Sequence, residues 1–124
     1  MAASPEKIRD VIEQYVARVA GGTTDQVLEL FAEGATVEDP VGTEVRTTRE
    51  AIREFYSGLE GLEQAGEVLS IRIAGGEAAF LFELRTRAGE QTYTLAPIDV
   101  MTFDDDGRIT SMRAYWSEAD MSVS

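Results

Sequence analysis

Apolar side chains recur at three- and four-residue steps between Pro5 and Ala20, which is the spacing of one face of an amphipathic helix. The apolar positions are Ile8, Val11, Ile12, Tyr15, Val16 and Val19. Ser4 is a suitable N-cap, and Gly21-Gly22 ends the pattern. We therefore predict a helix over residues 5–20 with Tyr15 on its buried face, where the phenol either packs as a core aromatic or finds a hydrogen-bond partner.

Two shorter helices are predicted before the middle of the chain. The first has Thr24 as its N-cap, an apolar face that includes Phe31, and an end at Gly34. The second is capped by Thr48 and stops before Gly61. Its apolar positions are Ile52, Phe55, Tyr56 and Leu59. Tyr56 therefore lies on or beside a second core-facing stripe.

The hydrophobic period changes to two in the second half of the chain, which indicates strands. The alternating apolar positions are Leu69, Ile71, Ile73, Ala78, Phe80, Phe82 and Leu84, with Gly75-Gly76 as the turn of a hairpin. We predict a long strand over residues 91–103 and a last strand over residues 108–116. Three helices followed by an antiparallel meander indicate a single α+β domain, residues 1–124, in which a curved sheet folds over the helices.

The charge of the chain excludes one class of partner. The net charge is −12, with one lysine and ten arginines, and binding to a phosphate backbone or to anionic lipid requires clustered cations. We expect neither nucleic acid nor a membrane surface as a partner. The chain has no histidine and no cysteine, so acid–base chemistry must use Asp, Glu, Tyr or Lys, and thiolate or zinc–thiolate chemistry is excluded.

Two observations concern localisation. No apolar run approaches the ~20 residues of a membrane span, and residues 1–4 lead into the first helix without a signal-peptide pattern. The absence of cysteine is compatible with a reducing compartment. We therefore expect a soluble, cytoplasmic protein.

Residues 35–42 place a carboxylate, Asp39, between a short apolar strand and a proline turn. Asp before Pro is common in turns, where its side chain bonds nearby backbone and the residue before proline is held extended. The alternative is a functional role for Asp39 as a general base, an interpretation that depends on the rest of the chain.

Asp99 lies in the middle of the predicted strand over residues 91–103. Because strand side chains alternate, it shares a face with Met101 and Phe103. An aspartate among apolar residues must either pair with a cation, such as Arg113 or Arg72 from a neighbouring strand, or be neutralised by a raised pKa. In the second case it is a protonated acid that can donate a hydrogen bond.

Several stretches together resemble bacterial ketosteroid isomerases. They are residues 37–42 (ValGluAspProValGly), 51–56 (AlaIleArgGluPheTyr), 96–99 (AlaProIleAsp) and 114–118 (AlaTyrTrpSerGlu), with Tyr15 placed 24 positions before Asp39. The resemblance covers essentially the whole chain. It implies the cone-shaped α+β fold of the nuclear-transport-factor-like superfamily, in which a curved antiparallel sheet wraps over three N-terminal helices and encloses an apolar pocket. It also implies a homodimer packed through the outer face of the sheet, where Val100 and Tyr115 are expected.

The resemblance also implies roles for individual residues. Asp39 would move a proton from C4 to C6 of a 3-oxo-Δ5-steroid, while Tyr15 and protonated Asp99 hydrogen-bond the dienolate oxygen. Tyr56 would orient the Tyr15 phenol, and the side chains that would contact the steroid rings are Phe82, Met112 and Trp116. Phe31 occupies a position where some members carry another tyrosine, so the phenol network would be shorter here. Ketosteroid isomerase is itself the standard example of a base paired with a neutral aspartic acid, a pattern taken here from the family.

This chemistry requires no metal, nucleophile or redox cofactor, so a chain without His or Cys can perform it. Two rival hypotheses stay open at this stage. One is another enzyme of the same fold, such as a cyclase, dehydratase or epoxide hydrolase. The dehydratases depend on a histidine, and this chain has none. The other is a non-catalytic module that binds a small apolar ligand.

Overall fold

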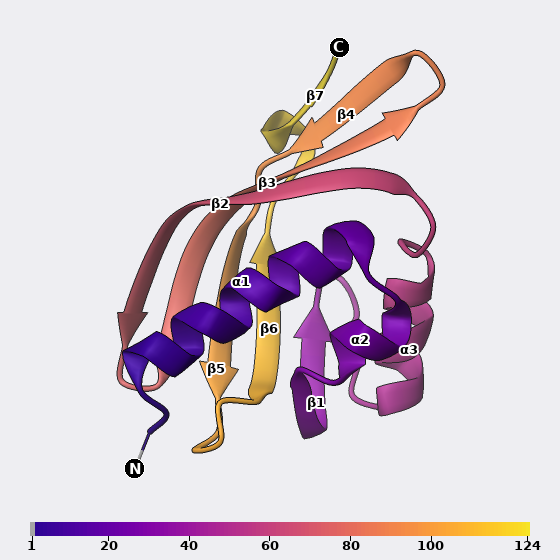
Figure 1. The fold of residues 1–124 in the computed structure, drawn as a ribbon. Helices are drawn as coiled ribbons and strands as arrows, with labels where there is room; N and C mark the ends of the chain where they lie inside the picture. The colour runs from indigo at the N-terminus through magenta and orange to yellow at the C-terminus, as the bar shows by residue number, and fades with distance from the viewer. Residues whose placement is uncertain (1) are drawn as a thin grey trace.

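Helix α1 (Pro5–Gly21) forms where its hydrophobic period predicts it. Ser4 Oγ accepts a hydrogen bond from the backbone N–H of Lys7 at 3.1 Å, and every apolar position of the predicted face is buried. The protein is described by a computed structural model over residues 2–124, in which α1 lies across the concave face of a curved sheet (Figure 1). Within these residues, no helix is long and apolar enough to cross a membrane.

Helix α2 (Thr24–Leu28) is shorter than predicted, and its cap is Thr23 rather than Thr24. The Thr23 side chain accepts from the backbone of Gln26 while the Gln26 side chain accepts from the backbone of Thr23, which satisfies two N–H groups at the helix start. Phe31 does not belong to this helix, because it begins strand β1 (Phe31–Glu38) and pairs with Ile109. Pairing within the sheet thus overrides the local helical pattern.

Helix α3 (Arg49–Ser57) confirms the third predicted helix. The Thr48 hydroxyl accepts from the backbone N–H of Ala51 at 3.1 Å, as expected for an N-cap. Tyr56 is buried on the face that packs against the interior. The helix lies beside α2 at one side of the sheet (Figure 1).

The sheet contains the remaining strands of residues 2–124. They are β2 (Glu63–Ala74), β3 (Glu77–Ala88), β4 (Gln91–Leu95), β5 (Ile98–Phe103), β6 (Ile109–Tyr115) and β7 (Met121–Val123), the last preceded by a 3₁₀ turn at Glu118–Asp120. Their order is β1-β6-β5-β3-β4-β7, with β2 on the free side of β3. The α+β class and the curved, unclosed sheet confirm the predicted fold, although β1 runs parallel to β6 rather than antiparallel.

The predicted long strand over residues 91–103 is instead two strands, β4 and β5. They are separated at Ala96-Pro97, and both pair antiparallel with β3. Proline has no N–H to give to a sheet ladder, so it interrupts the strand. Beyond the interruption, β4 extends with the outer part of β3 away from the helices (Figure 1).

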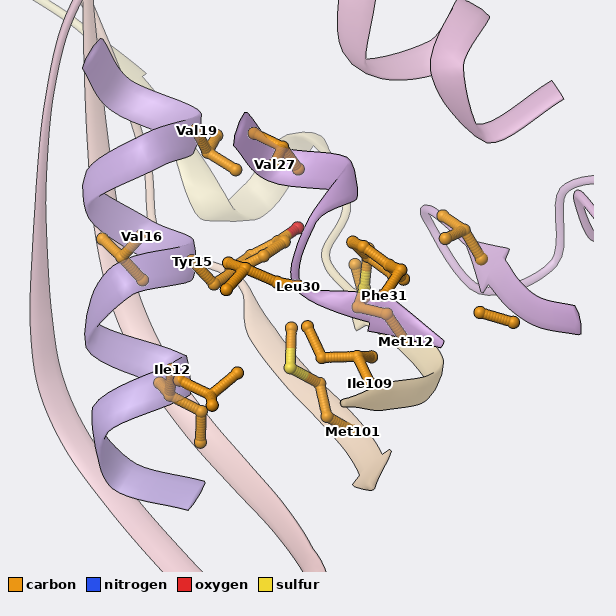
Figure 2. Close-up of a cluster of buried hydrophobic side chains, with 14 of the residues drawn as sticks. Ile12, Tyr15, Val16, Val19, Val27, Leu30, Phe31, Met101, Ile109 and Met112 are labelled. Carbon is orange, nitrogen blue, oxygen red and sulfur yellow. The ribbon is translucent and has the colours of Figure 1, made fainter. Parts of the chain in front are cut away.

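The core fills the space between α1 and the sheet. Figure 2 shows Tyr15 pointing from α1 toward Phe31, above Met101, Ile109 and Met112. Gly66 of β2 permits the close approach of α1, because a Cβ at this position would lie 2.9 Å from Val16 Cγ1. The phenol of Tyr15 is therefore held deep inside the cone rather than at its surface.

Candidate active site

A cavity of about 190 Å³ lies between the helices and the concave face of the sheet. It is lined by Val19, Asp39, Phe55, Tyr56, Leu59, Phe82, Leu84, Leu95, Pro97, Asp99 and Trp116. Most of these side chains are apolar, and the exceptions are two carboxyl groups, the Tyr56 phenol and the Trp116 indole N–H. An apolar hollow with a few convergent polar groups is the usual form of a small-molecule site.

Asp39 follows directly after β1, where strand alternation turns neighbouring side chains to opposite faces. Its predecessor Glu38 turns outward and accepts hydrogen bonds from Gly42 N (3.0 Å) and Arg113 Nε (2.8 Å). Asp39 turns inward, and its Oδ1 accepts a hydrogen bond from Trp116 Nε1 at 2.7 Å. Burial raises the pKa of the Asp39 carboxyl, whereas the Trp116 bond and the charge of Arg46 lower it. These opposing effects describe a carboxylate of increased basicity.

Asp99 is almost completely buried in β5, with 1% of its surface exposed. Its cross-strand neighbours are Phe80 and Ala114, and its Oδ1 has no hydrogen-bond partner within residues 2–124. Burial, followed by the charge of Asp39, raises the pKa of the Asp99 carboxyl well above its usual value. These surroundings therefore favour the neutral, protonated form of Asp99, which has a proton to donate.

The arginine partners considered for Asp99 bind elsewhere. Arg113 Nε donates to Glu38 Oε1 on the outer side of the sheet. Arg72 is exposed and donates to the backbone carbonyl of Ile71 at 2.8 Å. The cation-paired interpretation of Asp99 is therefore wrong, and the neutral carboxylic acid agrees with the geometry.

The hydroxyl groups of Tyr15 and Tyr56 form a buried hydrogen bond of 2.7 Å. Burial raises the pKa of both phenols well above 10, so both are protonated at neutral pH. The Tyr56 phenol and the Asp99 and Asp39 carboxyl groups add to the effect of burial in raising the pKa of Tyr15. When Tyr56 is the donor, the proton of Tyr15 is free for a ligand oxygen.

The Phe31 ring packs against both phenol rings of the Tyr15–Tyr56 pair. Its ring centroid lies 6.3 Å from that of Tyr15 and 5.8 Å from that of Tyr56. A phenylalanine ring has no hydroxyl to extend the hydrogen-bond chain, so the phenol network on this side ends at Tyr56.

The structure brings most of the predicted site residues to one cavity. Asp39, Tyr56, Phe82, Asp99 and Trp116 line it, and Tyr15 lies behind Tyr56. Met112 is fully buried in the core and is not among the lining side chains. Its expected contact with a steroid, like the catalytic roles of the others, stays a prediction.

Sequence reasoning missed part of the cavity wall. Leu84 follows Phe82 by two positions, so strand alternation could have placed it on the same face. Leu95 and Pro97 were not predicted because they line the cavity through the break between β4 and β5. Within residues 2–124, no group of Asp and Glu side chains is arranged to hold a metal ion.

Buried Asp99 predicts an unusual pH dependence of stability. A carboxyl group whose pKa is raised by folding binds its proton more tightly in the native state. Its contribution to the free energy of unfolding is therefore fully present below about pH 3.9, the pKa of an Asp in the unfolded chain, and is lost as pH rises through the pKa of the folded state. Asp99→Asn cannot ionise. We therefore expect its free energy of unfolding, measured in urea at about pH 5, 7 and 9, to fall less with rising pH than that of the parent. Exposed Asp106→Asn is the matched control, and equal pH slopes for Asp99→Asn and the parent would contradict the assignment.

Comparisons with known proteins agree with this geometry. The model of the SnoaL-like domain family matches residues 12–112. The chain is 47% identical over 117 residues to the Steroid Delta-isomerase of Nocardioides simplex, covering 94% of this chain and 95% of that protein. The cone-shaped fold and the cavity with two carboxyl groups therefore define a SnoaL-like protein.

More distant relatives share the fold. The Epoxide hydrolase LasB of Streptomyces lasalocidi is 29% identical over 98% of this chain, which spans about half the length of that protein. The solved structure of SalBIII, an epoxide hydrolase/cyclase-like enzyme of pyran ring formation in salinomycin, superposes with a TM-score of 0.87 at 29% identity and covers 96% of this chain and 97% of that one. The much higher identity to the first relative decides the subgroup: this chain belongs to the SnoaL-like family and, within it, to the bacterial ketosteroid isomerases.

Proposed function

We propose that this protein is a cofactor-independent steroid Δ-isomerase that moves the C5–C6 double bond of a 3-oxo-Δ5-steroid into conjugation with the ketone. The observation that supports this most strongly is the meeting, in one apolar cavity, of the Asp39 carboxylate, the buried Asp99 carboxyl group with its raised pKa, and the Tyr56 phenol, which is hydrogen-bonded to Tyr15 behind it. The 47% identity to a protein named as a Steroid Delta-isomerase supports the same reaction.

The first half of the reaction removes a proton from C4. Trp116 holds Oδ1 of Asp39, and the other carboxylate oxygen accepts the proton. The electron pair of the C4–H bond forms the C3–C4 double bond, and the ketone π electrons move to O3. The product is a dienolate with negative charge on O3.

The dienolate is stabilised by donors that are in place before the charge develops. In this proposal neutral Asp99 and Tyr15 each donate a hydrogen bond to O3, and Tyr56 is assigned as the donor in the Tyr15–Tyr56 hydrogen bond, in which either hydroxyl can donate. Hydrogen-bond donors fixed in a dry cavity stabilise a developing oxyanion more than water does, because they need no reorganisation. The buried, unpartnered oxygen of Asp99 is consistent with a group whose partner is the ligand.

The second half returns the proton to C6. The protonated Asp39 gives its proton to C6, and the electron pair of the C5–C6 double bond forms the new C6–H bond. The C3–C4 pair moves to form the C4–C5 double bond, and the charge on O3 re-forms the C3 ketone. One carboxyl group thus acts as base and then as acid. The cavity of about 190 Å³ is smaller than the ~300 Å³ of a typical small-molecule pocket, so the proposal requires that part of the steroid extend beyond it.

The proposal is tested by adding 5-androstene-3,17-dione and following the ultraviolet absorbance of the conjugated enone. Rapid growth of that absorbance in proportion to enzyme concentration is the expected result. Tight binding of the steroid with no absorbance change above the buffer rate would instead identify a binding module and overturn the isomerase proposal.

The protein is further proposed to be a cytoplasmic homodimer joined through the outer face of the sheet. Ile98 and Tyr115 are cross-strand partners of β5 and β6 on this face, with 46% and 43% of their surfaces exposed. Neighbouring exposed apolar side chains of this kind are typical of an interface. The half-buried Val100 contributes less to it than expected.

A charged substitution on this face tests the dimer. We expect the parent to sediment at twice the chain mass of 13.6 kDa and Ile98→Lys to sediment as a monomer, because the new charge would be buried without a partner. Leu62→Lys is the control, since Leu62 is equally exposed but lies in the turn after α3. A parent that sediments as a monomer at micromolar concentration would contradict the dimer.

A further inference from the structure

Arg46 occupies a position on the cavity side of β1 that no motif predicts. Its backbone pairs with Val37 in an antiparallel bridge, through Val37 N to Arg46 O (3.0 Å) and Arg46 N to Val37 O (2.8 Å). Directly paired residues place their side chains on the same face of a sheet. Val37 is fully buried and Asp39 lies two positions further on, so Arg46 shares the inward face with the proposed base.

The guanidinium of Arg46 packs against the wall of the cavity. Its Cζ lies 4.3 Å from the centroid of the Phe55 ring, and Phe55 lines the cavity together with Asp39. An arginine stacked on an aromatic face is held in a fixed position. Arg46 itself is not among the lining residues, so its positive charge is held against Phe55, outside the space that a ligand would occupy.

The charge of Arg46 is not neutralised by a partner. Within residues 2–124, Arg46 forms no ion pair, and its buried Nη1 has no hydrogen-bond partner. Glu44 and Glu54 line the same surface hollow as Arg46, yet neither is bonded to it. A buried donor left without a partner is unfavourable for folding, so the position of this nitrogen is not explained by a hydrogen bond of its own.

Among the groups that face Asp39, Arg46 is the one whose positive charge lowers the pKa of the Asp39 carboxyl. Burial raises the pKa of Asp99 of β5, Tyr15 of α1 and Tyr56 of α3, which favours the neutral form of each, and Trp116 does not titrate. The preceding residue of β1, Glu38, turns outward to Arg113. The charge of Arg46 lowers the pKa of both Asp39 and Tyr56.

We propose that Arg46 is a positioning residue that keeps the Asp39 carboxylate ionised inside the apolar cavity by means of an unpaired charge fixed behind Phe55. This inference rests on the proposed isomerase function. The guanidinium acts from a distance and leaves the carboxylate oxygens free: a direct ion pair would stabilise the ionised form further but would also occupy the oxygen that must accept the proton from C4.

The test is the pH profile of kcat/KM for Arg46→Met. The acidic limb of this profile reports the ionisation of the base in the free enzyme. Loss of a nearby positive charge makes the carboxylate harder to form, so the acidic limb should move to higher pH by about 0.5–1 pH unit. At pH values well above the limb, kcat/KM should change little. Arg46→Lys keeps the charge but loses the planar group that stacks on Phe55, so its limb should lie between those of the parent and Arg46→Met.

Two controls separate this role from a structural one. Arg72→Met removes the same charge from an exposed site on β2 and should leave the limb where it is in the parent. A uniform loss of kcat/KM in Arg46→Met, with the limb unmoved, would assign Arg46 to folding alone and overturn the proposal.

A ¹³C NMR titration of the Asp39 carboxyl in ligand-free Arg46→Met should show the same upward shift of the titration midpoint relative to the parent. Because it requires no turnover, this titration decides the role of Arg46 even if the steroid assay fails, and an unshifted midpoint would refute that role.

Discussion

Asp39→Asn is expected to lower kcat by about 10²–10⁴-fold, the usual contribution of a positioned general base. The amide has nearly the same shape as the carboxyl group and can still occupy the space beside Trp116, but it cannot accept the proton from C4. Affinity for a phenolic steroid, a stable mimic of the dienolate, should change much less than kcat. Steady-state kinetics and a fluorescence titration with that ligand measure the two effects separately.

Glu38→Gln is the matched control for this substitution. Glu38 is the neighbouring carboxylate, but it lies on the outer face and bonds Arg113. Its loss should leave kcat within about threefold of the parent, since a partly exposed ion pair contributes little. If Asp39→Asn instead turned over at the parental rate, the base would have to be another group.

Asp99→Leu is expected to lower kcat by about 10²–10³-fold, because it removes one of the donors to the dienolate oxygen. The same substitution should raise the stability of the protein above neutral pH, since it replaces a buried carboxyl that resists ionisation by an apolar side chain. Activity and stability would then change in opposite directions. Loss of both would indicate that Asp99 acts in packing rather than as a donor.

Asp99→Asn separates hydrogen bonding from acidity at the same position. Its neutral amide can donate to the ligand oxygen, so most of the activity lost in Asp99→Leu should return. Tyr15→Phe removes the other donor and should lower kcat to an extent comparable with Asp99→Leu. If Asp99→Asn is as inactive as Asp99→Leu, a neutral hydrogen-bond donor at this position is not sufficient, and the acidic proton itself is required.

Helices α1 and α3 and the β2–β3 hairpin could be predicted because their local signals agree with their tertiary positions. The cap and apolar face of α1 coincide, and so do those of α3. Alternation in β5 correctly places Asp99 and Met101 on the buried face. Phe31 is the opposite case, because its spacing from Val27 and Leu28 fits a helix while its pairing with Ile109, far along the chain, makes it part of a strand.

The parts of the site that depend on distant contacts could not be predicted from spacing. The hydrogen bond from Trp116 to Asp39 joins residues 77 positions apart, and the sequence suggested only an apolar contact for this tryptophan. Arg46 lies in a polar segment without a hydrophobic period. Its position over Phe55 arises from the bridge to Val37. Asp99 was identified because a carboxylate within an apolar strand conflicts with local preference, and such conflicts are expected at functional sites.

A crystal structure with a phenolic steroid tests the central claim most directly. The account predicts the phenolic oxygen within about 3 Å of both Tyr15 Oη and a carboxyl oxygen of Asp99, with Asp39 over the ring carbons that correspond to C4 and C6. An oxygen bound by only one of these groups, or a steroid seated outside the cavity that Asp39 and Asp99 share, would contradict it.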